Sequence, residues 1–113
     1  MKKEIIKAIA SNPSTPGDTL NELMEKYKDD EDILFAIASN PSTPVYVLRE
    51  IAAKTSNRRM LIEIVNNPKV TALALQEIIS KSNDMQVLYK IAKKTDIPGL
   101  VISKLLEKIS AME

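Results

Sequence analysis

The sequence predicts an all-α fold, an α-solenoid in which about eight short helices stack as pairs. Three observations lead to this prediction. A tract of eight residues returns at a near-constant interval, apolar residues around it keep the spacing of one helix face, and prolines punctuate the repeats at equivalent points. A repeat of 27–28 residues has room for two short helices and their turns.

The recurring tract has the sequence Ile-Ala-Ser-Asn-Pro-Ser-Thr-Pro. It occupies residues 9–16 and returns unchanged at residues 37–44, an offset of 28. Degraded copies begin at Ile64 and Ile91, and each lies 27 residues after the copy before it. The identity over eight residues and the constant offset identify an internal repeat.

The segment that follows each tract has the pattern of an amphipathic helix. Leu48, Ile51 and Ala52 stand at i, i+3 and i+4, which is one face of an α-helix. The first position of this pattern recurs as Leu20, Leu75 and Ile102, and we expect these residues to lie in the core. The Thr before the second proline is expected to cap this helix, as Thr15 and Thr43 would, and Asp96 is its expected replacement in the last repeat.

A second, shorter helix is predicted before each Asn-Pro. Ile33, Leu34 and Ile37 form one apolar face, with equivalents in the other repeats. Proline disfavours helix at the residue before it, so Asn-Pro should end this helix. The residues expected to cap its start are Asp29, Ser56 and Asn83.

The repeats account for the whole chain as a single helical-repeat domain over residues 1–113. We expect the first helix at about 2–10 and the last at about 98–110. The predicted divisions are a half repeat over 1–11, repeats over 12–39, 40–66 and 67–93, and a terminal half repeat over 94–113.

Composition argues against several classes of function. The chain has no Cys and no His, which removes thiol chemistry and the commonest general base and zinc ligand. No catalytic constellation or glycine-rich phosphate loop stands out, so we expect no enzyme activity, no cofactor and no metal. We found no signal-peptide pattern and no apolar run long enough to span a membrane, so the expected location is cytoplasmic, without a membrane partner.

The tract Ala-x-Asn-Pro-x-Thr-Pro-x-x-x-Leu-x-x-Leu, at residues 10–23 and 38–51 with a weaker copy at 65–78, resembles the leucine-rich repeat variant family. That family is similar in shape to the HEAT and armadillo repeats. The resemblance implies a right-handed stack of helices and no particular activity. The present repeats are a few residues longer, and they have apolar pairs such as Ile33-Leu34 where the family often has Val-Arg. The iron–sulfur clusters that occur beside such repeats need Cys, which this chain lacks.

One column of apolar residues is the candidate binding surface. Phe35, Ile62 and Tyr89 are equivalent positions of the second helix, and Lys7 takes the same place in the first half repeat. They lie about 200° around the helix from the first core position. In related solenoids this helix lines the concave surface, so the three side chains would form a stripe edged by Glu63 and Lys90. The alternative is that they pack between adjacent helices and complete the core.

A second candidate is a ladder of lysines at one position of the four first-type helices. Three of the four follow a Glu four residues earlier, which favours self-neutralised pairs on a solvated face over a phosphate-binding surface. The members are Lys26, Lys54, Lys81 and Lys108, with Glu22, Glu50 and Glu77.

The leading hypothesis is a non-enzymatic module that binds a protein or peptide in its groove. A nucleic-acid-binding repeat is the alternative, with basic residues of the C-terminal half as its contacts, namely Arg58, Arg59, Lys90, Lys93 and Lys94. The net charge of +1 makes nucleic acid the weaker hypothesis. A purely structural module is a third reading, and the open faces of the first and last helices could mediate end-to-end self-association.

Overall fold

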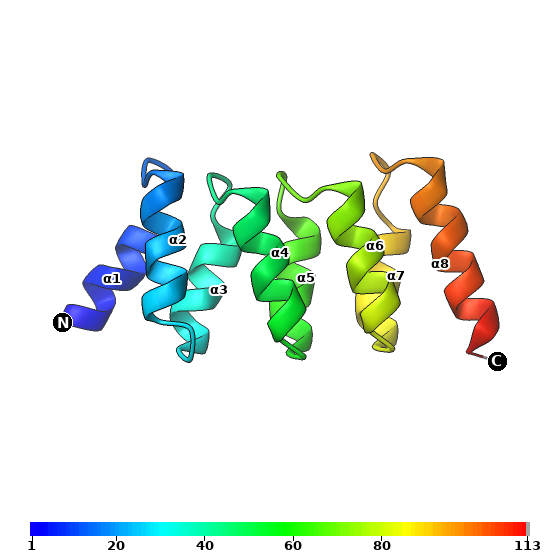
Figure 1. The fold of residues 1–113 in the computed structure, drawn as a ribbon, viewed down its shortest axis with the longest axis horizontal. Helices are drawn as coiled ribbons and strands as arrows, with labels where there is room; N and C mark the ends of the chain where they lie inside the picture. Colours follow the sequence, from blue (N-terminus) through cyan, green and yellow to red (C-terminus); the bar gives the residue numbers. More distant parts are fainter. Residues whose placement is uncertain (113) are drawn as a thin grey trace.

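The computed structural model describes residues 1–112, and these residues form an all-α fold of eight helices without strands (Figure 1). The first-type helices of the repeat are the even-numbered ones, and the second-type helices are the odd-numbered ones. Their bounds are α1 Lys2–Ser11, α2 Gly17–Lys26, α3 Glu31–Ser39, α4 Val45–Lys54, α5 Arg58–Asn66, α6 Ala72–Lys81, α7 Met85–Ala92 and α8 Gly99–Ala111.

The helices stand in two rows, with α2, α4, α6 and α8 in front of α1, α3, α5 and α7 in Figure 1. Within each row every helix packs against the next member of that row, and the helices of the two rows also touch. The molecule is accordingly elongated, measuring 48 × 23 × 18 Å. Each helix pair therefore buries its apolar faces against the pair beside it.

The interior register predicted from the apolar spacing is confirmed. Leu48 and Leu75 are almost completely buried, as are Ile33 and Ile37 on the other row. The core is a single aliphatic cluster that runs along the molecule between the rows. The expectation fails at the last helix, where Ile102 is exposed. Its equivalents face the following repeat, and no helix of the described chain follows α8.

The first-type helices begin differently from the prediction. Pro16, Pro44 and Pro98 precede the first helical residue without a side-chain cap, so neither the two Thr residues nor Asp96 caps the helix. Instead the Thr15 hydroxyl donates a hydrogen bond of 2.6 Å back to the Ile9 carbonyl, and Thr43 does the same to Ile37 at 2.7 Å. These hydroxyls satisfy carbonyls at the end of the preceding helix.

In the third repeat Thr stands where the other repeats have the second proline. Its side chain does cap the helix, because Thr71 Oγ1 accepts a hydrogen bond from the Ala74 amide at 3.2 Å. The second-type helices are capped by Asp30, Asn57 and Asp84, each one residue after the cap expected from sequence.

The Asn of Asn-Pro clamps adjacent repeats together. Asn40 Nδ2 donates to the carbonyls of Ala10 and Asn12, both at 2.9 Å. Asn67 makes the same two contacts one repeat later, to Ala38 at 2.8 Å and Asn40 at 3.0 Å. Both Asn side chains are buried, and their Oδ1 atoms accept a hydrogen bond from their own turn. The recurring tract is thus a hydrogen-bonded joint between repeats.

Candidate functional site

A groove of about 610 Å³ crosses the row of odd-numbered helices between α1, α3 and α5. Its apolar part is formed by Phe35 and Met60, and its rim carries charges of both signs from Lys7, Glu31 and Arg59. Phe35 is thus the one accessible large apolar side chain of the groove, set among polar and charged residues, and protein interfaces favour an aromatic side chain within a polar rim. One of the predicted column residues, Phe35, is therefore placed where a partner could reach it.

Phe35 lies two residues after the buried Ile33 on α3, so its ring is turned from the core centre toward α5. It is half-buried and packs against the core cluster. The guanidinium of Arg59 stands 4.3 Å from the ring centroid, a cation–π distance. Arg59 is itself exposed, so it covers one side of the ring without sealing the groove.

The acidic edge of the groove is tied to α1. Lys3 Nζ lies 3.1 Å from Asp32 and 3.3 Å from Asp30 on the next odd-numbered helix. The hydrogen bonds to Asp32 and then Asp30 raise the pKa of Lys3 above its usual value. Asp30 in turn caps α3. Two of the four acids at residues 29–32, Asp30 and Asp32, are thus engaged in capping or ion pairing.

The three predicted column residues differ in exposure, because Phe35 and Ile62 are half-buried and Tyr89 is exposed. Ile62, like Phe35, is half-buried and packs against the core cluster, but it does not line the groove. Tyr89 is 57% exposed and lines a separate hollow at the C-terminal end, with Lys93 Nζ 5.7 Å from its ring centroid. Of the two flanking residues, Glu63 is half-buried and Lys90 is exposed. None of the three column residues is fully buried, and their exposure depends on which helix stands next to them.

Four of the five basic residues considered for nucleic-acid binding have other partners, counting the cation–π contact of Lys93 with Tyr89 described above. Arg58 Nε lies 2.9 Å from Asp84 of α7, Arg59 stacks on Phe35, and Lys94 lies 3.7 Å from Asp96. Lys90 and Lys93 are exposed. The five residues therefore do not form one continuous basic surface of side chains without other partners.

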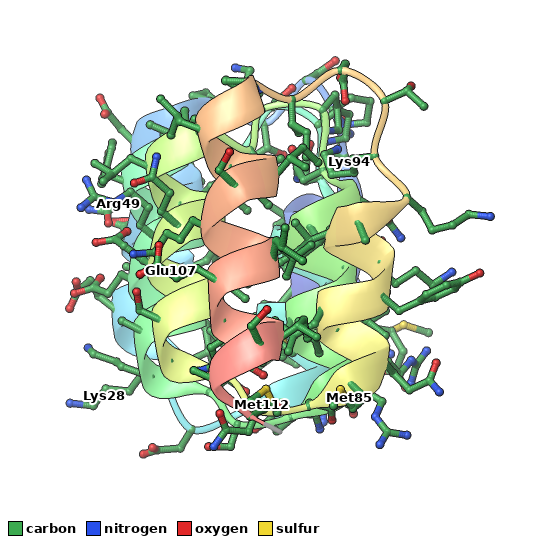
Figure 2. The ribbon with its side chains drawn as sticks, turned by 90° about the vertical axis from the view of Figure 1, so that its right-hand side faces the viewer. Lys28, Arg49, Met85, Lys94, Glu107 and Met112 are labelled. Atoms are coloured by element: carbon green, nitrogen blue, oxygen red, sulfur yellow. The ribbon has the colours of Figure 1, made fainter. Side chains whose placement is uncertain are left out.

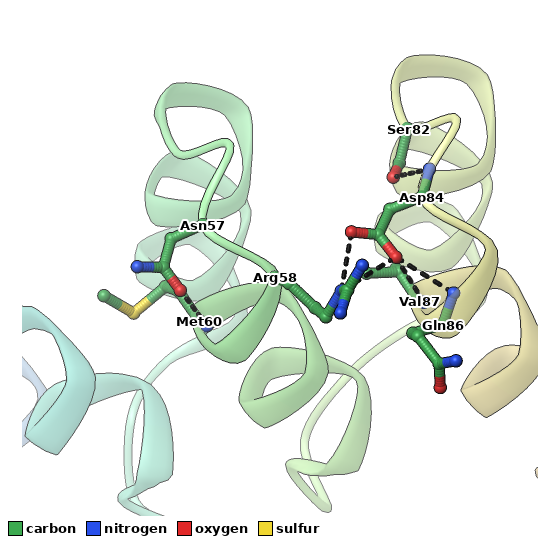
Figure 3. A network of polar contacts seen from close by, with 7 residues as sticks. All are labelled: Asn57, Arg58, Met60, Ser82, Asp84, Gln86 and Val87. Atoms are coloured by element: carbon green, nitrogen blue, oxygen red, sulfur yellow. Dashed lines mark hydrogen bonds and ion pairs between the residues drawn. The ribbon is translucent and has the colours of Figure 1, made fainter.

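The Arg58–Asp84 pair joins two neighbouring odd-numbered helices (Figure 3). Asp84 also caps α7 by accepting hydrogen bonds from the Gln86 and Val87 amides. The hydrogen bond from Arg58 holds the pKa of the Asp84 carboxyl below its usual value. The Asp84 carboxylate thus caps the start of α7 and also links α7 to α5, the preceding odd-numbered helix.

The lysine ladder is paired as predicted in only one of its three Glu-to-Lys steps. Lys54 lies 3.6 Å from Glu50, but Glu77 is bound by Arg49 at 2.8 Å. Lys81 instead donates to the carbonyls of Ala52 and Thr55, and Lys108 reaches Ser80 at 3.4 Å. Carbonyls at a helix C-terminus carry partial negative charge, which favours an ammonium there. The later lysines therefore join neighbouring even-numbered helices.

The sequence interpretation missed a second apolar column. Tyr46, Leu73 and Leu100 are equivalent positions near the starts of α4, α6 and α8, and each is at least half exposed. Their spacing of 27 residues was available in the sequence. They stand two residues before Leu48, Leu75 and Ile102, of which the first two are buried, so only the register of both rows together identifies them as surface residues.

Comparison with known proteins gives no relative: no family model, no curated protein and no solved structure matches the chain. The resemblance to the leucine-rich repeat variant family therefore stays a prediction that rests on the recurring tract. Among residues 1–112, no helix combines the length and the apolar character needed to cross a bilayer.

Proposed function

We propose that this chain is a right-handed α-solenoid, similar to the leucine-rich repeat variant family, that acts as a non-enzymatic binding module for a protein or peptide. The observation that carries the proposal is the groove centred on Phe35. It offers one aromatic anchor with a cation stacked on it, and interface hot spots are enriched in aromatic residues and Arg.

The chemistry of the rim supports a peptide segment of mixed charge as the partner. Lys7 and Arg59 are basic, whereas Glu31 and Asp32 are acidic, so the groove suits a segment with an apolar side chain flanked by charges of both signs. A nucleic acid would place phosphates against these acids at a cost. We therefore expect no retardation of DNA or RNA in a gel at micromolar protein and low salt.

The test is affinity capture with the whole chain as bait, from extracts of its source, followed by mass spectrometry. Arg59→Glu changes the exposed rim without touching the core, and we expect it to abolish capture of the specific partner. Lys69→Glu makes the same charge reversal on an exposed turn outside the groove and serves as the control. Equal capture by the two variants would contradict the proposal.

A further inference from the structure

The repeat lets each end of the molecule be compared with its interior. On the odd-numbered row, Ile5 and Ile9 of α1 are equivalent to Ile33 and Ile37 of α3. The two α3 residues are buried, whereas Ile5 is 54% and Ile9 is 40% exposed. Since α3 packs on α1 and α2, the exposed face of α1 is the face that its equivalents use to contact the preceding repeat.

The C-terminal end of the molecule exposes the face that interior repeats use to contact the repeat that follows them. Ile102 and Leu106 of α8 are 44% and 67% exposed, whereas the equivalent Leu75 and Ile79 of α6 are buried. Beside them, between α7 and α8, is a hollow of about 520 Å³. Its apolar lining includes Leu88, Leu105, Ile109 and Tyr89. Figure 2 looks onto this end, where Met85 marks the start of α7 and side chains stand uncovered between the two helices.

The polar groups of the two ends match as well. Asn12 is equivalent to the clamping residues Asn40 and Asn67, but it is exposed, and its Nδ2 donates to no group in the described residues. Its Oδ1 already accepts from the Ser14 amide at 2.9 Å, which holds the side chain as in the other turns. If the pattern of Asn40 and Asn67 is continued by one repeat, the acceptors for the Asn12 Nδ2 group are the carbonyls of Ala92 and Lys94, at the far end of the molecule.

From these three matches we propose that the partner of the two open ends is a second copy of this chain, stacked head to tail. The α1 helix of one copy packs beside α7 and behind α8 of the other, as α3 packs beside α1 and behind α2. Ile5 and Ile9 cover the hollow, and Asn12 donates to the Ala92 and Lys94 carbonyls. The interface joins two different faces, so each added copy leaves one face free for the next.

The test is sedimentation of the full chain over a wide concentration range. The weight-average mass should rise from 12.6 kDa with concentration and should not stop at the dimer. Ile9→Glu alters only the N-terminal face and Leu106→Glu only the C-terminal face, so each variant alone should remain a monomer. Because both residues are exposed, circular dichroism should show unchanged helix. Ile5→Glu replaces Ile9→Glu if that variant unfolds.

Mixing distinguishes a head-to-tail junction from any contact between like faces. The Ile9→Glu chain keeps an intact C-terminal face and the Leu106→Glu chain an intact N-terminal face, so an equimolar mixture should give a one-to-one dimer that grows no further. Leu73→Glu, which changes an exposed residue away from both ends, should associate like the unmodified chain. The proposal is overturned if the unmodified chain stays monomeric up to about 1 mM, or if the mixture of the two variants shows no dimer.

Discussion

At the scale of single residues, the buried Asn side chains are the polar groups on which the joints between repeats depend. Asn40 donates two hydrogen bonds to the preceding repeat and accepts one from its own turn. A buried group of this kind is costly to remove, because the partners that remain lose their hydrogen bonds without gaining water.

Asn40→Ala is therefore expected to lower the free energy of unfolding by about 2–4 kcal/mol. Asn12→Ala is the matched control, because Asn12 stands in an identical tract but is exposed and makes only the bond to the Ser14 amide. Its expected cost is below about 1 kcal/mol. Urea denaturation in dilute solution measures the free energy of unfolding of both variants. Equal losses would mean that the hydrogen bonds of Asn40 to the preceding repeat contribute nothing to stability.

The Arg58–Asp84 pair makes a prediction about pH. Because the folded-state pKa of Asp84 lies below the unfolded value of about 3.9, the stability that this carboxylate adds is present above that pH and is lost as the pH falls through the folded pKa. Asp84→Asn keeps a good helix cap but removes the charge. The denaturation midpoint of the unmodified chain should exceed that of the variant at neutral pH, and the difference should vanish in acid. A difference that stays constant with pH would contradict this account.

At the scale of the helix, exposure is decided by the neighbouring repeat as much as by the helix itself. Leu48 and Leu75 are buried, and we expect either one changed to Ala to cost about 2–5 kcal/mol. Ile102→Ala, at the equivalent position of α8, should cost below about 1 kcal/mol because that side chain is exposed. Glu50→Ala should also cost less than about 1 kcal/mol. Thermal or urea unfolding measures these losses. If Leu75→Ala and Ile102→Ala lower the free energy of unfolding equally, the helix register described here is wrong.

The same dependence on neighbours explains how much could be predicted from the sequence. Helix number and interior burial follow from apolar spacing and proline, which are local properties. The caps were placed one residue early because the adjacent Ser56-Asn57 and Asn83-Asp84 are chemically interchangeable as caps. The exposure of Ile102 and the reach of Asn40 across repeats depend on what stands in the next repeat, which no single segment reveals.

The candidate groove was predictable in part for the same reason. Phe35 could be identified from its place in the column, but its partner Arg59 comes from the next odd-numbered helix. The three column residues are equivalent in the repeat, yet Phe35 and Ile62 are half-buried against the core and Tyr89 is exposed. Three equivalent residues therefore occupy three different environments.

At the scale of the whole molecule, stability should decline from the middle toward the ends. Each helix packs mainly on its neighbours along the rows, so α1 and α8 each lack one neighbour within the described chain, whereas α4 and α5 have theirs on both sides. In such arrays the total stability is close to a sum of contributions from repeats and from the contacts between neighbours. The end helices should therefore open without unfolding the centre.

Amide hydrogen exchange measures this gradient directly. In dilute solution we expect the amides of α4 and α5 to exchange most slowly and those of α1 and α8 to exchange fastest. If copies stack head to tail, raising the protein concentration should slow exchange in α1 and α8, because each then gains the neighbour that it lacks, while α4 and α5 change little. Ile9→Glu should remove that concentration dependence and leave the dilute gradient intact. Uniform protection along the chain in dilute solution would show that the repeats unfold as one cooperative unit.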